Sequence, residues 1–155
     1  MNIRITDEHP SSGVDPVALH LWATVTLAAE GYPETTEVSL TLVADEQMAV
    51  WNATALGKEG PTDVLSFPVE LLQPGVVPVG DADGPPLLVG DVVIAPDYVR
   101  RQAKDMEVDS LDELALMVTH GILHLLGYDH TNDEEAELME SRERDILELV
   151  GRSRR

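Results

Sequence analysis

The residues best suited to chemistry lie between positions 120 and 130, where three of the five histidines of the chain occur. His120 and His124 are four residues apart, so both imidazole rings would leave the same face of a helix. Gly127 can end that helix in a left-handed conformation, and the chain can then bring His130 back toward the other two rings. Three neutral imidazoles around one point are typical of a catalytic zinc site with an open fourth position. We therefore expect one zinc ion on His120, His124 and His130.

The alternative is a buried helix with incidental histidines, because Leu123, Leu125 and Leu126 have the character of core residues. Such a helix would have to satisfy several buried ring nitrogens. A metal ion does this directly, with outer acceptors taking the N–H groups. The metal site is the better explanation.

The candidate catalytic residues are His120, through the metal, and Asp129. Asp129 could accept the N–H of a ligating imidazole or poise a water molecule at the metal. A turn carboxylate that closes the corner at residues 127–128 is an equally good interpretation.

The residue after the first histidine separates two kinds of zinc hydrolase. The spacing H-x-x-x-H-x-x-G-x-x-H matches the three-histidine metzincin peptidases, in which a glutamate at that position is the general base. Here the position holds Gly121, which cannot take a proton. A metzincin-like metallopeptidase is therefore disfavoured, and remains an alternative on spacing alone.

Two further motifs accompany the histidines: residues 61–68 read P-T-D-V-L-S-F-P and residues 90–94 read G-D-V-V-I. Together with H-G-I-L-H-L-L-G-Y-D-H at 120–130, they resemble the YbeY family of bacterial endoribonucleases over residues 35–150. The resemblance implies one zinc ion on the three histidines and cleavage of single-stranded ribosomal RNA, chiefly at small-subunit ends, and not of DNA. It also implies a role in ribosome quality control, with the small ribosomal subunit and assembly factors as partners.

One position departs from the family pattern. Many members carry an arginine before the Gly-Lys turn, where it is thought to contact RNA, and this chain has Leu56 there. Lys58 is near but lacks the bidentate fork of arginine, and Arg100 and Arg101 are candidate substitutes. The candidate substrate-binding residues are Lys58, Asp63, Ser66 and Arg100. For the second and third of these, stabilising the end of a strand is at least as good an interpretation.

The net charge of −19 conflicts with a nuclease, because polyanion binding usually rests on a basic surface. We expect weak, salt-sensitive binding to naked RNA, with specificity supplied by a partner. A ribosome-assembly binding protein with structural zinc is a further alternative. The acidity could instead reflect an acidic or salt-adapted proteome.

Length and composition predict one globular domain over residues 1–155, because 155 residues with 43% hydrophobic content can bury a sizeable core. The apolar runs are too short for a membrane span, and residues 1–5 do not resemble a secretory signal. The chain has no cysteine, which fits a reducing cytoplasm.

The hydrophobic patterns predict an α+β fold: about four strands in a mixed sheet, with about five helices packed around it. The histidines fall on a central, buried helix. His9 and His20 are interpreted as structural, and Trp22 and Trp51 as core. A Pro/Gly-rich loop or hairpin at 69–88 could border the site, but a surface insertion is the better interpretation.

The expected strands are 2–6, 37–43, 62–67 and 89–95. The expected helices are 16–30, 45–56, 97–104, 111–126 and 132–150, with capping boxes at 110–113 and 131–134.

Overall fold

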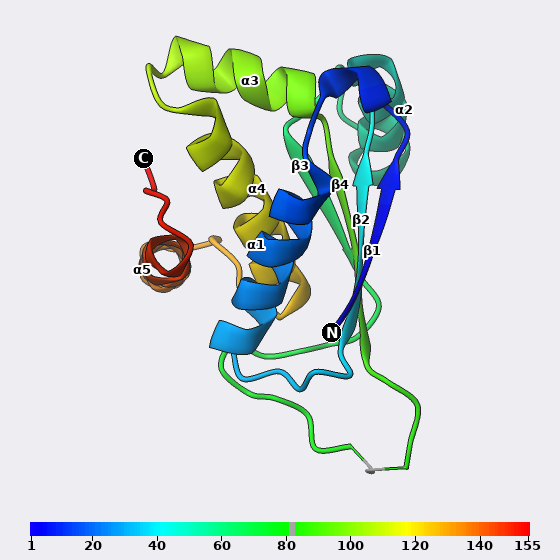
Figure 1. Ribbon diagram of the computed structural model, residues 1–155, viewed down its shortest axis with the longest axis vertical. Helices are drawn as coiled ribbons and strands as arrows, with labels where there is room; N and C mark the ends of the chain where they lie inside the picture. The colour runs from blue at the N-terminus through cyan, green and yellow to red at the C-terminus, as the bar shows by residue number, and fades with distance from the viewer. Residues whose placement is uncertain (81–82) are drawn as a thin grey trace.

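Four strands form one mixed sheet in the computed structural model, which describes residues 1–80 and 83–155 (Figure 1). The spatial order is β1-β2-β4-β3, in which β1 and β2 and β2 and β4 are parallel, while β3 is antiparallel to β4. β3 is therefore an edge strand. The strands are β1 (Asn2–Asp7), β2 (Glu37–Leu42), β3 (Val64–Pro68) and β4 (Leu88–Ile94).

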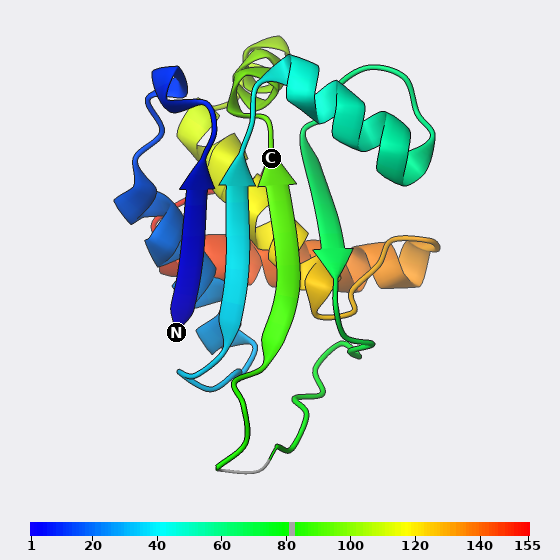
Figure 2. The same ribbon diagram turned by 90° about the vertical axis from the view of Figure 1, so that its right-hand side faces the viewer.

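Most of the helices cover one face of this sheet. Figure 1 shows α1, α4 and α5 together on that face, while Figure 2 looks onto the opposite, largely uncovered face. The predicted α+β class, mixed sheet and five helices are confirmed. The helices are α1 (Pro16–Ala29), α2 (Asp45–Leu56), α3 (Pro96–Asp105), α4 (Ser110–Leu125) and α5 (Asp133–Leu149), with a short 3-10 turn, η1 (Pro10–Ser12).

The central helix α4 packs closely on the sheet because Gly121 has no side chain. A Cβ at this position would lie 2.6 Å from Cγ1 of Val92 on β4 and 3.2 Å from Cγ2 of Val64 on β3. The Ser66 hydroxyl donates a hydrogen bond of 2.9 Å to the Gly121 carbonyl, which fixes β3 against the helix. These contacts hold α4 rigidly against the two strands.

The helices α1 and α2 start where predicted, whereas the starts of α3, α4 and α5 differ by one residue. Asp109, and not Ser110, caps α4 by accepting from the backbone N–H groups of residues 111 and 112. Asn132, and not Thr131, caps α5 by accepting from residue 135. α2 has Ala44 at its N-cap, without a side-chain hydrogen bond. At the starts of α4 and α5 the adjacent side chains can cap equally well, so sequence alone does not choose between them.

The two tryptophans differ in burial. Trp22 on α1 is buried, as expected, whereas Trp51 is 40% exposed, so the prediction of a core position is wrong for Trp51. α2 buries only Met48 and Asn52, because it lies at the end of the sheet, and Trp51 falls beside that narrow stripe. Its ring lies 5.5 Å from the ring of Phe67 on β3.

The other two histidines lie away from the three-histidine segment. His9 Nε2 is 2.7 Å from a carboxylate oxygen of Asp97, which ties the N-terminal turn to α3. His20 is exposed on α1.

The segment 69–88 is irregular where it is described, apart from a bridge between Gln73 and Val76 and from Leu88, the first residue of β4. Residues 81–82 of this predicted loop lie outside the described residues. A Cβ on Gly127 would overlap the Leu72 carbonyl, so the start of the segment packs beside the turn that follows α4. Among the helices of residues 1–80 and 83–155, none has both the length and the apolar character needed to cross a membrane.

Candidate metal centre

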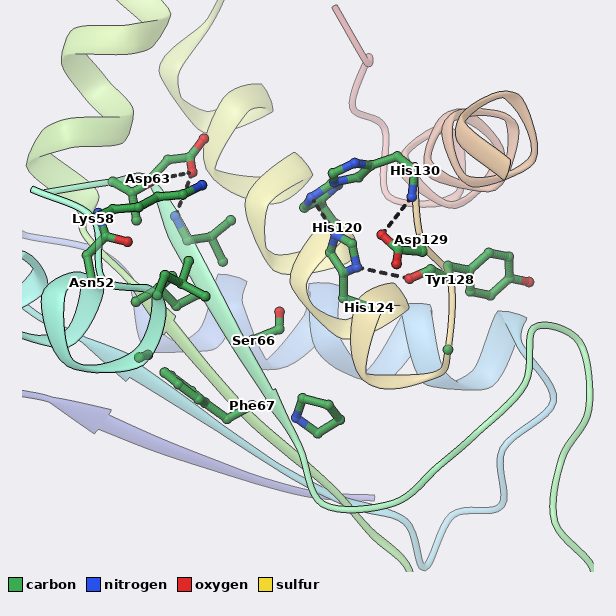
Figure 3. Close-up of a pocket in the computed structure, with 17 residues that line it drawn as sticks. Asn52, Lys58, Asp63, Ser66, Phe67, His120, His124, Tyr128, Asp129 and His130 are labelled. Carbon is green, nitrogen blue, oxygen red and sulfur yellow. Dashed lines mark hydrogen bonds between the residues drawn. The ribbon is translucent and has the colours of Figure 1, made fainter. Parts of the chain in front are cut away.

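The three predicted histidines come together in space. His120 and His124 project from α4, and His130 follows on the loop before α5 (Figure 3). One ring nitrogen from each lies within 4.8 Å of the others, and the two Nε2 atoms of His120 and His124 are 3.1 Å apart. Tetrahedral zinc with Zn–N bonds of about 2.0–2.1 Å needs nitrogens roughly 3.3 Å apart. The cluster is therefore close to the dimensions of a zinc site.

A tight turn at the end of α4 returns the chain toward the cluster. Gly127 has φ +101°, and its N–H donates to the His124 carbonyl at 3.1 Å. The next N–H, of Tyr128, donates to the Leu123 carbonyl at 3.0 Å, and the Tyr128 side chain is buried. This pair of bonds is the Schellman arrangement, which needs a left-handed residue. The glycine thus carries out the role predicted for it.

The hydrogen-bond partners assign the tautomers of two rings. His120 Nδ1 lies 3.3 Å from Oε2 of Glu143, and His124 Nδ1 lies 2.9 Å from the Tyr128 carbonyl oxygen. Both partners are acceptors, so both Nδ1 atoms donate a proton, and in the neutral form of each ring Nε2 then carries the lone pair. Two lone pairs facing each other at 3.1 Å repel unless a cation lies between them. The donor set therefore fits a metal ion.

The His124 ring is also held in its neutral form. The pKa of His124 is lowered from 6.5 to about 4, mainly by burial and also by the neighbouring His120 and His130. The Asp129 carboxylate and the Tyr128 carbonyl oppose this effect. A neutral imidazole at neutral pH has its lone pair available, as metal binding requires.

The cluster lines a cleft of about 540 Å³. We name its two sides: the histidine wall is α4 with residues 126–132, and the strand wall is residues 52–63 with β3. Figure 3 shows the three rings on one side and Lys58 and Asp63 on the other. Among the described residues that line the cleft, Lys58 is the one lysine or arginine. Leu56, which is 54% exposed, also lines it.

Two predicted substrate-binding residues line the cleft but have bonds within the protein. Asp63 accepts from the Val64 N–H at 2.8 Å and from the Gln102 amide at 3.2 Å, which fixes the start of β3. The Ser66 hydroxyl is bonded to Gly121, as described above. Both residues therefore shape the strand wall.

Of the remaining predicted residues, one lies at the cleft and two lie elsewhere. Asp129 lines the cleft, and its Oδ1 accepts from the His130 N–H at 2.8 Å. Arg100 does not line the cleft: it lies in a hollow between α1, α3 and α4, 3.5 Å from Asp97. Arg101 binds Asp45 at 2.6 Å. The structure thus brings Asp129 to the histidines and leaves both arginines elsewhere.

Glu143 was missed by the sequence analysis. It is 1% exposed on α5 and contacts His120, 23 residues earlier in the chain. A signal was present, because Met139, Glu143 and Ile146 recur at helical spacing and all three are buried. In a helix as acidic as α5, that one inward glutamate is hard to separate from its exposed neighbours.

Fold and site together define a single-domain α+β protein with a three-histidine candidate metal centre on a buried helix. The model of the family described as Endoribonuclease YbeY matches residues 5–151. The chain therefore belongs to the YbeY endoribonuclease family, as its motifs indicated.

Individual relatives support this family assignment. The Endoribonuclease YbeY of Geobacillus sp. strain WCH70 is 42% identical over 125 residues, covering 81% of this chain and 80% of that protein. That of Acidothermus cellulolyticus is 42% identical over 140 residues, covering 88% and 83%. The solution structure of TM1509 from Thermotoga maritima has a TM-score of 0.58 at 25% identity, covering 96% of this chain and 91% of that one. The fold is thus shared with a solved structure.

Proposed function

We propose that this protein is a zinc-dependent endoribonuclease that cleaves single-stranded RNA during ribosomal RNA processing. The observation that carries the proposal is the pair of inward lone pairs on His120 and His124, beside His130, in a cleft whose opposite wall carries Lys58. The relatives named Endoribonuclease YbeY supply the reaction class. In this proposal the substrate is the ends of small-subunit ribosomal RNA, and the partners are the small subunit and its assembly factors. The protein also acts in ribosome quality control and is located in the cytoplasm.

The residues of the cleft have distinct roles in this proposal. Zinc held by the three histidines would act as a Lewis acid on the scissile phosphate and lower the pKa of water toward ~7. Lys58 would bind a phosphate of the RNA from the strand wall. Asp129 has Oδ1 bonded to the backbone, and we assign its second oxygen to accept the proton of the nucleophile. That nucleophile is either water or the RNA 2′-hydroxyl.

The acidic charge is compatible with weak binding to naked RNA. With 29 acidic and ten basic residues, the chain carries a net charge of −19, which repels a polyanion. Lys58 is the single ammonium group among the described residues of the cleft, so few phosphate contacts are made there. Specificity would then come from ribosomal partners, and binding would weaken steeply with salt.

The two alternatives are less well supported. A structural zinc site is closed by four protein ligands, whereas this cluster lines an open cleft and His130 is exposed. A metzincin-like peptidase needs a carboxylate after the first histidine. Here the position is Gly121, and a Cβ on it would lie 2.6 Å from Val92 in the sheet, so the packing leaves no room for a glutamate side chain.

The test is cleavage of a single-stranded ribosomal RNA fragment by zinc-loaded protein. The controls are His120→Ala and EDTA treatment. Cleavage by the native protein, with none by His120→Ala and none after EDTA treatment, supports the proposal. Protein shown to hold one zinc that leaves the RNA intact, both free and on small ribosomal subunits, overturns it.

A further inference from the structure

A buried carboxylate holds one metal-ligand ring and not the others. Oε2 of Glu143 accepts the Nδ1–H of His120 at 3.3 Å, and the Glu143 side chain is 2% exposed. His124 is held instead by a backbone carbonyl, which no substitution removes. Among the described residues, the His130 ring packs against the other two rings and makes no hydrogen bond. The orientation of His120 therefore depends on one replaceable side chain.

The second oxygen of that carboxylate is bound by the segment after α5. Nε of Arg154 lies 3.4 Å from Oε1 of Glu143, and its NH2 group lies 3.6 Å from Glu140. The Arg154 side chain is only 14% exposed. A buried carboxylate loses its hydration, and pairing with an arginine compensates for that loss.

We propose that Arg154 and Glu143 form a positioning relay for the metal centre. Arg154 holds the Glu143 carboxylate, the carboxylate fixes the His120 ring with Nδ1–H outward, and Nε2 is thereby aimed at the other histidines. Glu143 and Arg154 are positioning residues, because both act through His120. The segment 152–155 is then part of the support of the site. This inference rests on the proposed metal site but not on the proposed ribonuclease activity.

The chain contains a matched control for this relay. Glu113 on α4 is also 1% exposed and is also paired with an arginine of the same segment, Arg155, at 2.8 Å. Its remaining side-chain partner is the Gln102 amide at 3.3 Å, and none of its bonds involves a histidine. Both pairs bury a carboxylate, and only one of them touches a metal ligand.

The experiment compares Glu143→Gln with Glu113→Gln and Arg154→Ala with Arg155→Ala in the full chain. The affinity of each folded variant for Zn²⁺ is measured by competition with a chromophoric chelator, and thermal unfolding is followed in parallel. We expect all four substitutions to lower Tm. Only Glu143→Gln and Arg154→Ala should also weaken Zn²⁺ binding, by about 10–100-fold, as loss of a partner behind a ligating histidine typically does.

A second readout needs no metal. Long-range ¹H–¹⁵N spectra of the metal-free protein report which His120 nitrogen carries the proton. We expect Nδ1–H in the native protein and in Glu113→Gln, and a mixture of tautomers in Glu143→Gln, because an amide can donate as well as accept.

The outcomes separate the relay from the site itself. Equal Zn²⁺ affinities in Glu143→Gln and Glu113→Gln, with an unchanged His120 tautomer, would overturn the relay and leave the metal site intact. Failure of the native protein to bind Zn²⁺ at all would overturn the metal site and the relay together. If Glu143→Gln does not fold, Arg154→Ala against Arg155→Ala decides by the same two measurements.

Discussion

The two walls of the cleft are built differently. The histidine wall rests on α4, whose inner residues are buried, and its rings are bonded to Glu143 and to the Tyr128 carbonyl. The strand wall consists of the edge strand β3 and the exposed end of α2. Among the described residues that line the cleft, Lys58 is its one lysine or arginine, and Leu56 lines the cleft near it. The first wall has bonds that orient the histidines of the candidate metal site, whereas the second has one described lysine or arginine to offer a substrate.

This difference matches the different demands of metal binding and substrate binding. Metal binding needs ring nitrogens held within tenths of an ångström, and a packed helix supplies that rigidity. A substrate bound through a few phosphate contacts needs much less, especially if a partner orients it. Substitutions in the histidine wall should therefore have large effects and those in the strand wall small ones.

The largest effect is expected from His124→Ala. It removes one of three ligands, so zinc affinity should fall by more than about 100-fold, beyond the loss typical of an outer partner. Equilibrium dialysis with Zn²⁺ measures it. His20→Ala, an exposed histidine on α1, is the control and should bind zinc normally. Full zinc retention by His124→Ala would refute the site.

Gly121→Ala tests the close packing behind the histidine wall. The new Cβ would lie 2.6 Å from Val92, and overpacking costs about 1–3 kcal/mol, partly offset by the better helix propensity of alanine. We expect the free energy of unfolding in urea to fall by about 1–2 kcal/mol. Gly80→Ala, at a position with open space around it, should change little. Equal stability of both variants would contradict the packing argument.

The stability of the metal-free protein should depend on His124. Its pKa is about 4 in the folded state against 6.5 when unfolded, so between these values the unfolded state binds more protons. The contribution is therefore complete above pH 6.5 and is lost as the pH falls toward 4. Because the ring is partly exposed, we expect a loss of about 2 kcal/mol at most.

Urea unfolding of EDTA-treated protein at pH 7 and pH 4.5 measures this loss. His124→Gln does not titrate in this range, so its stability should fall less than that of the native protein. Identical pH dependence in the two proteins would show that another group is responsible.

Lys58→Ala tests the strand wall. Removal of one phosphate contact should weaken single-stranded RNA binding a few-fold and reduce the slope of log K against log salt by about 0.7. Fluorescence anisotropy across a salt series measures both. Lys104→Ala, an exposed lysine on α3 outside the cleft, should leave the slope closer to the native value. Equal slopes in the two variants would remove Lys58 from the RNA path.

The smallest effect, and a gain, is expected from Leu56→Arg. This residue already lines the cleft beside the turn at Gly57, and arginine would offer a bidentate group to a phosphate. Single-turnover cleavage should rise a few-fold. Leu56→Lys adds the same charge without the fork, so it separates geometry from charge; a larger gain from lysine would contradict the bidentate explanation.

Features set by neighbouring residues could be predicted from the sequence. The spacing of His120, His124 and His130 with Gly127 defined a cluster, because helical geometry and a left-handed turn are local. The strand and helix positions followed from hydrophobic periods in the same way. At the starts of α4 and α5 the errors amounted to a single residue, between two side chains equally able to cap.

Other features depended on tertiary packing. Arg100 lies outside the cleft and Trp51 outside the core because of where α3 and α2 meet the sheet, which no local pattern records. Glu143 reaches His120 only because α5 packs beside α4. The sequence by itself determined which residues could bind a metal. The packing of distant segments decided what supports those residues and what faces them, because such contacts arise only when the whole chain is folded.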